Sequence, residues 1–290
     1  MKDDRGTLIT FIGSTPRIGT SVTAFSAAYM LAERLNSKVG YICLNLKSSK
    51  LHRYLGVDEP EVTLDQLRAD LRSGTLTPAK LYESCFRPYK QISLSVLFGN
   101  MLREQAELYM PEHVEHLLDT ARECFDICVL DVSAYWDNAA TIIGMRECRR
   151  AILVTNDELA CFQEDVQRWL EQGVSLYSIS REKLLLWVNQ SFEGEGGYSA
   201  KQIEKELGIP MIGALRANRK FAKSVHEGKL DIAVQESTWS GYMEDGLKQL
   251  FHLMNWIPVN EQRRGTKLSK WIGKKRPAFM KQQKEMKGSV

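Results

Sequence analysis

Short apolar runs alternate with helix-periodic segments through most of the chain, and this alternation limits the possible folds more than any other feature. Seven runs of up to eight residues have the composition of strands: 7–13, 39–46, 92–99, 126–132, 149–156, 183–190 and 209–215. Their apolar residues are continuous rather than alternating, so both faces of each strand should be buried. The pattern predicts an α/β fold: a mostly parallel seven-stranded sheet with helices on both faces.

The chain divides into a body and a basic tail. It has 290 residues and no linker or repeat before about residue 258, so we expect one domain over residues 1–257 and a tail over 258–290. From Glu261 onward there are ten Lys and Arg against two Glu, a net charge of +8. Since the whole chain carries +3, residues 1–260 carry −5. This asymmetry predicts an anionic partner for the tail alone.

The tail contains a short amphipathic segment. Leu268, Trp271 and Ile272 share one helical face. Basic side chains surround that face: Lys267, Lys270, Lys274, Lys275 and Arg276. Basic residues beside a Trp-containing apolar face suit an anionic membrane surface. A solvated, disordered tail is the alternative, and nucleic acid is a rival anionic partner.

The N-terminus and the apolar runs bear on location. The first residues, "MKDDRG", lack the apolar region of a signal peptide. No apolar run approaches the roughly 18 residues needed to cross a bilayer. We therefore expect a cytoplasmic protein, which the tail could attach peripherally to the inner face of the membrane.

The stretch "GSTPRIGTS" joins the first strand to the first helix, where a phosphate-binding loop would lie. A P-loop, G-x-x-x-x-G-K-[ST], supplies backbone N–H groups, a lysine and a hydroxyl that binds magnesium. Here Gly19 and Ser21 keep their relation, but Thr20 replaces the lysine. Pro16 removes one N–H donor, and Arg17 stands where a glycine would permit positive φ. The candidate phosphate-binding residues are Gly13, Ser14, Thr15, Pro16, Arg17, Ile18, Gly19, Thr20 and Ser21.

The order of segments from about residue 7 to 255 resembles the MinD/ParA family of P-loop proteins, whose deviant Walker A motif is K-G-G-x-G-K-[ST]. Aligned on Gly19, Thr15 and Thr20 stand at the family's two lysines. The strand at 126–132 resembles the Walker B strand and keeps Asp131.

Two further segments carry the resemblance. Residues 39–57 are similar to the family's second strand and switch I, with Asn45 and Lys47 at its two acidic positions. The strand at 183–190 resembles the one whose asparagine contacts adenine, here Asn189.

The resemblance implies an altered ATP site. ATP would bind weakly, near Arg17, Lys47 and Asn189, and Mg²⁺, if bound at all, would be held by Ser21 and Asp131. Phosphoryl transfer depends on positioning and charge, so losing both lysines and both switch acids should prevent efficient ATPase activity.

Within the family, degraded loops of this kind resemble TadZ/CpaE-type factors of bacterial pilus assembly. The resemblance therefore implies a positioning or scaffold protein that forms a homodimer and brings a protein partner to a membrane-bound assembly. A slow but genuine ATPase remains an alternative, with Asp131 holding Mg²⁺. A non-specific DNA-binding partition or regulatory protein is another.

Overall fold

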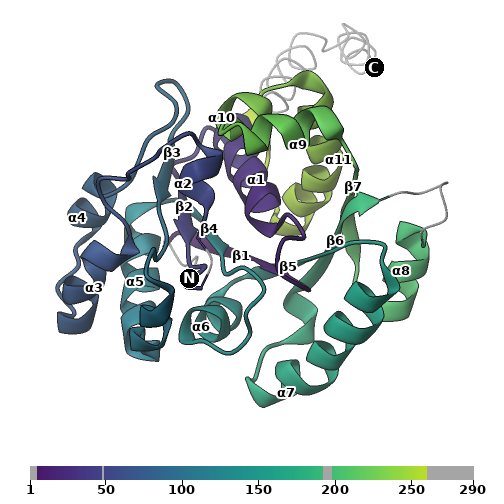
Figure 1. Ribbon diagram of the computed structural model, residues 1–290, viewed down its shortest axis with the longest axis horizontal. Helices are drawn as coiled ribbons and strands as arrows, with labels where there is room; N and C mark the ends of the chain where they lie inside the picture. Colours follow the sequence, from purple (N-terminus) through teal and green to yellow (C-terminus); the bar gives the residue numbers. More distant parts are fainter. Residues whose placement is uncertain (1–4, 48, 192–197, 260–290) are drawn as a thin grey trace, which may run out of the picture.

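The protein is described by a computed structural model, which covers residues 5–47, 49–191 and 198–259. At its centre is one seven-stranded sheet in the order β3-β2-β4-β1-β5-β6-β7, with every neighbouring pair parallel (Figure 1). The strands are β1 (Thr7–Gly13), β2 (Val39–Cys43), β3 (Leu94–Leu97), β4 (Ile127–Asp131), β5 (Arg150–Thr155), β6 (Leu184–Ser191) and β7 (Met211–Arg216). The predicted seven-stranded parallel sheet is confirmed.

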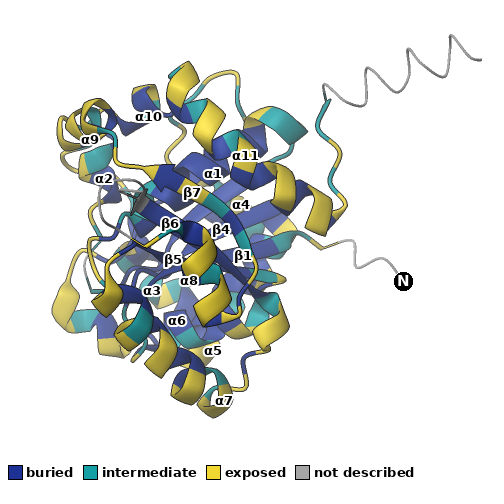
Figure 2. Ribbon diagram, turned by 90° about the vertical axis from the view of Figure 1, so that its right-hand side faces the viewer, coloured by how far each residue is buried: buried dark blue, intermediate teal, exposed yellow. Residues whose placement is uncertain are grey.

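Helices cover both faces of the sheet, with buried residues turned toward it and exposed ones outward (Figure 2). One face carries α1 (Thr20–Leu35), α2 (Leu51–Tyr54), α9 (Arg219–His226), α10 (Leu230–Ala233) and α11 (Ser237–Met254). The other carries α3 (Leu64–Ser73), α4 (Pro78–Glu83), α5 (Pro111–Cys124), α6 (Ala139–Glu147), the wider helical turns η2 (Ala160–Val166) and η3 (Trp169–Gly173), α7 (Val174–Leu176) and α8 (Ala200–Leu207). Two short 3₁₀ turns, η1 (Arg103–Leu108) and η4 (Arg181–Lys183), lie in connections.

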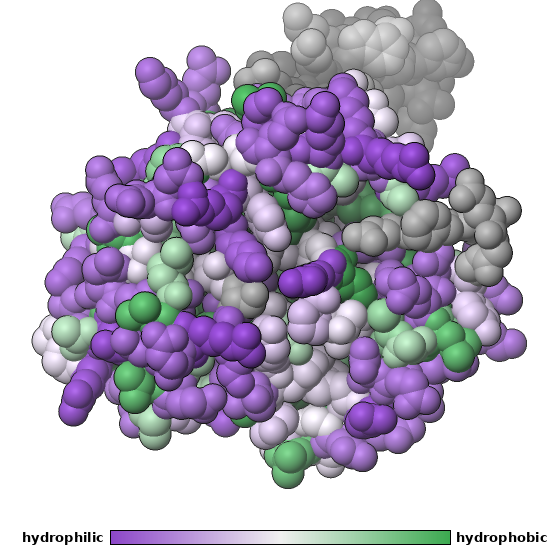
Figure 3. Space-filling model, in the orientation of Figure 1, coloured by the Kyte–Doolittle hydropathy of each residue, from purple (hydrophilic) through white to green (hydrophobic). Residues whose placement is uncertain are grey.

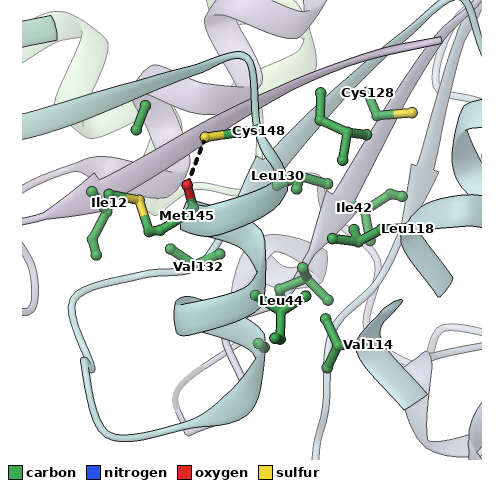
Figure 4. Packing of buried hydrophobic residues seen from close by; sticks show 14 of the residues in the cluster. Ile12, Ile42, Leu44, Val114, Leu118, Cys128, Leu130, Val132, Met145 and Cys148 are labelled. Carbon is green, nitrogen blue, oxygen red and sulfur yellow. Dashed lines mark hydrogen bonds between the residues drawn. The ribbon is translucent and has the colours of Figure 1, made fainter. Parts of the chain in front are cut away.

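Each strand contributes to two separate cores because successive side chains point to opposite faces of a sheet. In β1, Leu8 and Ile12 belong to the core under α5 and α6, whereas Ile9 and Phe11 belong to the core under α1. Figure 4 shows the first of these cores, where the Cys148 thiol donates to the carbonyl oxygen of Met145 at 3.3 Å. The continuous apolar runs of the sequence are thus explained by burial on both faces.

The surface and the long helices bear on membrane contact. On the face seen in Figure 3, hydrophobic residues form small separate areas within a mostly hydrophilic surface. Within the described ranges, no helix is both long enough and apolar enough to cross a membrane. The predicted tail, residues 258–290, lies almost wholly outside the described residues, so its membrane-facing residues stay predictions.

The topology fixes where a site can form. β1 is central, with β4 on one side and β5 on the other. The order in which successive strands join the sheet reverses at β1, because β2, β3 and β4 lie on one side of it and β5, β6 and β7 on the other. In a parallel sheet all carboxyl ends lie at one edge, and ligands bind where the strand order reverses. The loop that follows β1 is therefore at the place where an α/β sheet most often binds a ligand.

Candidate functional site

The loop between β1 and α1 takes a tight turn with two left-handed residues. Arg17 has φ 69° and Gly19 has φ 93°. A Cβ atom at Gly19 would lie 2.8 Å from Nδ2 of Asn189, so position 19 needs glycine for both its backbone angle and its space. Arg17 adopts the conformation that glycine usually supplies, at some cost in backbone energy.

Thr20 and Ser14 turn their hydroxyls into the protein. A Cβ atom at Gly13 would lie 2.4 Å from Oγ1 of Thr20, which shows that the Thr20 side chain folds back over the start of the loop. The Ser14 hydroxyl donates to Oγ1 of Thr155 on β5 at 3.2 Å, and both side chains are buried. Thr20 therefore supplies no positive charge where a P-loop lysine would.

Asp131 closes β4 and is fully buried. Its Oδ2 accepts a hydrogen bond from the Tyr41 hydroxyl at 2.8 Å, and its Oδ1 accepts one from the N–H of Ser133 at 3.1 Å. Burial raises the pKa of Asp131, and the nearby Ser21 side chain and the hydrogen bonds from Tyr41 and Ser133 oppose that rise. Both oxygens are thus engaged by protein donors.

Tyr41 was not singled out by the sequence, although it is an aromatic residue in an otherwise aliphatic and small-residue strand. It lies on β2, next to β4, and its hydroxyl also lies 3.5 Å from the carbonyl oxygen of Ser21. Burial and the neighbouring Asp131 raise its pKa well above the usual value. Tyr41 therefore stays protonated and acts as a donor to Asp131.

Lys47 points to acidic partners beside the loop. Its ammonium lies 2.7 Å from Oδ2 of Asp137 and 3.6 Å from Oε1 of Glu107. The hydrogen bond to Asp137 raises the pKa of Lys47. Because these carboxylates already neutralise it, Lys47 offers little charge to a second anion.

Asn189, near the end of β6, holds the loop after β1 through side-chain hydrogen bonds. Its Nδ2 donates to the carbonyl oxygen of Ile18 at 3.0 Å and to Oγ1 of Thr23 at 2.8 Å. Its Oδ1 accepts from the indole N–H of Trp187 at 3.1 Å. The amide is 5% exposed, and its polar atoms are used to hold the loop in place.

A cavity of about 770 Å³ opens over this loop, at the carboxyl edge of the sheet. Most of the predicted phosphate-binding residues line it: Thr15, Pro16, Arg17, Gly19, Thr20 and Ser21, together with Asn189. Gly13, Ser14 and Ile18 lie behind the loop surface, and neither Lys47 nor Asp131 belongs to the lining. The structure thus brings most of the loop and Asn189 together around the cavity and leaves five predicted residues outside its lining.

The lining of this cavity is strongly cationic. Five Lys and Arg residues from four segments line it: Arg17, Lys50, Arg103, Arg216 and Arg219. All five are exposed, and among the described residues none has a carboxylate partner within 4.0 Å. No Asp or Glu belongs to the lining. Only Arg17 of these was predicted, although the dense basic stretch "RANRK" at 216–220 was visible in the sequence.

One part of the cavity wall is apolar. Leu215, Phe221 and Trp239 contribute to it. The rings of Phe221 and Trp239 stack at 3.4 Å between centroids with a 9° angle between planes, and the Trp239 indole donates to Oγ of Ser26 at 3.0 Å. The cavity therefore offers a cationic region and an aromatic region together.

Tyr54 lies within the electrostatic influence of both the cationic lining and the buried acid. It lines the cavity from the end of α2 and is half-buried. Burial is the main cause that raises its pKa; Asp131 raises it further and Arg17 lowers it. Its phenol is therefore influenced by both Arg17 and Asp131.

The residues fit an anion and do not fit Mg²⁺. Magnesium prefers oxygen ligands, above all carboxylates and phosphates. Asp131 is fully buried, accepts a hydrogen bond at each oxygen and does not line the cavity. Asn45 and Lys47 stand at the other two acidic positions of the resemblance. Across the part of the chain that the structure describes, no three His, Cys, Asp or Glu side chains form a group able to hold a metal.

Comparison with solved structures identifies the fold as that of MinD/ParA proteins. A ParA family ATPase from Chlorobium tepidum superposes with a TM-score of 0.69 at 16% identity, over 83% of this chain and 98% of that one. MinD from Pyrococcus horikoshii, complexed with Mg-ADP, gives 0.68 at 17% identity, over 86% and 97%. MinD in the MinC:MinD complex of Aquifex aeolicus gives 0.64 at 18% identity, over 85% and 96%.

Comparison by sequence gives no such match. No protein-family model and no curated protein matches this chain. At identities of 16–18% the structural likeness establishes a shared P-loop NTPase fold and does not by itself assign an activity.

Proposed function

We propose that this chain is a MinD/ParA-like positioning or scaffold protein that has lost efficient ATP hydrolysis. It would work in the cytoplasm as a homodimer, bind a protein partner and hold it at an anionic membrane surface through the basic tail. The TadZ/CpaE-type factors of pilus assembly are the branch we favour, because they share degraded loops.

The enclosure of Asp131 is the observation that carries this proposal. In phosphoryl transfer the metal and its ligands neutralise charge as it develops on the phosphates. Here the remaining acid accepts hydrogen bonds from Tyr41 and from the N–H of Ser133. Thr20 supplies no charge in place of the lysine. The parts that would stabilise a transition state are weakened, whereas the cavity that could bind a ligand is retained.

The solved relatives support a role in binding. The MinD from Aquifex aeolicus is seen in complex with MinC, so this fold can present a surface to a partner protein. The MinD from Pyrococcus horikoshii is seen with Mg-ADP. We propose that this chain keeps the partner-binding use of the fold and has reduced the hydrolytic one.

Phosphate release by the full-length chain, measured with Mg²⁺ and ATP, tests the proposal. We expect the same background rate for the wild type and for Asp131→Asn, which keeps the shape of the side chain and removes its charge. Turnover that is well above background in the wild type and lost in Asp131→Asn would instead establish a slow ATPase. That alternative is favoured by the proximity of Ser21 and Asp131, the two residues that would hold Mg²⁺, because the Ser21 side chain lowers the pKa of the Asp131 carboxyl.

A further inference from the structure

The cations around the cavity come from separate segments that converge on one space. Arg17 belongs to the loop after β1 and Lys50 precedes α2. Arg103 begins η1, between β3 and α5, and Arg216 and Arg219 flank the junction of β7 and α9. Parallel topology brings the ends of these strands to one edge, which is why residues up to 202 positions apart line one cavity.

Electrostatic repulsion within such a group of cations destabilises the folded protein unless an anion binds among them. Like charges that line one concave space repel one another even though each is exposed, because the cavity walls concentrate their combined field. An unpaired cation is not unusual by itself, since exposed Arg72 and Arg149 also have no carboxylate within 4.0 Å among the described residues. What distinguishes the five is that they line one cavity whose lining holds no Asp or Glu. The five cavity cations have none among the described residues, and Lys47, three residues before Lys50, has two.

The site also lacks the usual means of holding a metal with the anion. Asp131 is enclosed, and the cavity lining holds no carboxylate. A divalent cation bound with phosphates would add positive charge to a cavity that already has five basic side chains. We infer that this cavity binds a polyphosphate ligand without magnesium, with Arg17, Lys50, Arg103, Arg216 and Arg219 in the charge-neutralising role.

Several consecutive phosphates suit the site better than one. Five basic residues from four segments line this cavity of about 770 Å³, more than one phosphate can contact at once. A chain of phosphates can reach more of them, and guanidinium groups bind phosphate oxygens in a bidentate manner. Both a nucleoside triphosphate and inorganic polyphosphate have this chemistry. Phe221 and Trp239 line the cavity but are only 7% and 6% exposed, so the comparison of ATP with tripolyphosphate decides which of the two ligands the site prefers.

This inference shares one assumption with the proposed function, namely that the altered loop still forms a binding site. It is tested by measuring ligand binding, whereas the proposed function is tested by measuring ATP turnover. Calorimetric titration of the full-length protein with ATP, and separately with inorganic tripolyphosphate, would be done with Mg²⁺ and then with EDTA. We expect binding in EDTA at least as tight as with Mg²⁺, because magnesium lowers the negative charge of the ligand. ATP binding tighter than tripolyphosphate binding would identify a nucleotide as the better ligand, and the reverse order would identify polyphosphate.

Variants test whether these residues form the site. Arg103→Gln, Lys50→Gln and Arg17→Asn should each weaken binding in EDTA by roughly tenfold, the effect of one charge-assisted hydrogen bond. Asparagine is chosen at position 17 because it tolerates left-handed backbone. Arg72→Gln is the matched control, since Arg72 is exposed on α3 and does not line the cavity. Thermal unfolding would verify that each variant is folded.

Three results would overturn the inference: binding that strictly requires Mg²⁺, no binding of either ligand, or cavity variants that behave like Arg72→Gln. None of them would restore hydrolysis, so the proposed function would stand or fall separately on the turnover assay. Conversely, Asp131-dependent turnover would defeat the proposed function even if binding in EDTA were observed.

Discussion

At the scale of single residues, the buried pair of Tyr41 and Asp131 sets the chemistry of the loop. The hydroxyl and the carboxylate meet at 2.8 Å with no exposure of Asp131. A buried charged acceptor that loses its donor has no water to replace it. The Tyr41 hydroxyl therefore stabilises the fold and, by the same bond, occupies the acid that a metal would need.

Tyr41→Phe is expected to lower the free energy of unfolding by about 1–3 kcal/mol near neutral pH. Burial raises the pKa of Asp131 in the folded state. The contribution of this carboxyl to the free energy of unfolding is therefore fully present at pH values below the ordinary carboxyl pKa, and it is lost as pH rises through the pKa of Asp131 in the folded protein. Without the hydroxyl the folded pKa rises further. The cost should therefore be larger at about pH 7 than at about pH 4.

Urea unfolding at both pH values would measure this effect. Tyr89→Phe is a useful control, because the Tyr89 hydroxyl donates to the backbone carbonyl oxygen of Asp231 at 2.8 Å rather than to a buried carboxylate. It should destabilise the protein without the same rise between acid and neutral pH. Equal costs of Tyr41→Phe at the two pH values would contradict the assigned role of Asp131.

At the scale of elements, the contact between α11 and the sheet depends on glycine. Trp187 on β6 is fully buried, and its ring lies against Gly213 of β7 and Gly246 of α11. A Cβ atom would lie 2.6 Å from the ring at Gly213 and 2.4 Å from it at Gly246. These distances are too short for any carbon contact, so α11 can approach the sheet this closely only where a side chain is absent.

Two glycines of the same helix should therefore respond in opposite directions to alanine. Alanine normally stabilises a helix interior by about 1 kcal/mol relative to glycine. Gly241→Ala should show up to about this gain, because no atom lies within 4 Å of its Cβ position. Gly246→Ala should instead cost about 1–3 kcal/mol, as overpacking against Trp187 displaces the helix or the ring. Equal effects in denaturant unfolding would show that the helix does not pack as described.

The elements were largely predictable from the sequence, and the site was only partly so. Strands buried on both faces leave continuous apolar runs, so all seven were predicted, although β2 ends at Cys43 rather than at residue 46. Leu44 and Leu46 are buried beyond the end of the strand, so hydrophobicity alone does not mark where pairing stops. The loop after β1 was predicted because its residues are consecutive.

The cations were harder to predict because distant partners decide which of them face the cavity. Lys47 and Lys50 are three residues apart and have the same side chain. Lys47 pairs with Asp137, 90 positions along the chain, and Lys50 lines the cavity. Arg103 lies in the connection after β3 and Arg216 ends β7, so the strand order decides whether they meet. No local pattern carries that information, whereas the order of strands does.

At the scale of the whole molecule, the body and the tail carry opposite net charge. Residues 1–260 sum to −5 and the remainder to +8. The cationic cavity is therefore a local exception on a mildly acidic body. If the tail binds anionic membranes and the cavity binds polyphosphate, these two activities should be separable, because they use different parts of the chain.

A chain that ends at residue 259 tests this separation. All seven strands and the helices that cover both faces of the sheet lie between residues 5 and 259, so its unfolding midpoint and its ATP affinity in EDTA should match those of the full-length chain. The full-length chain should co-sediment with anionic vesicles but not with zwitterionic ones, and added salt should weaken that binding. The shortened chain, and full-length Trp271→Glu, should lose it. Equal sedimentation of the full-length and shortened chains would exclude the tail as the anchor, and salt-sensitive binding of duplex DNA in place of vesicles would make nucleic acid its partner.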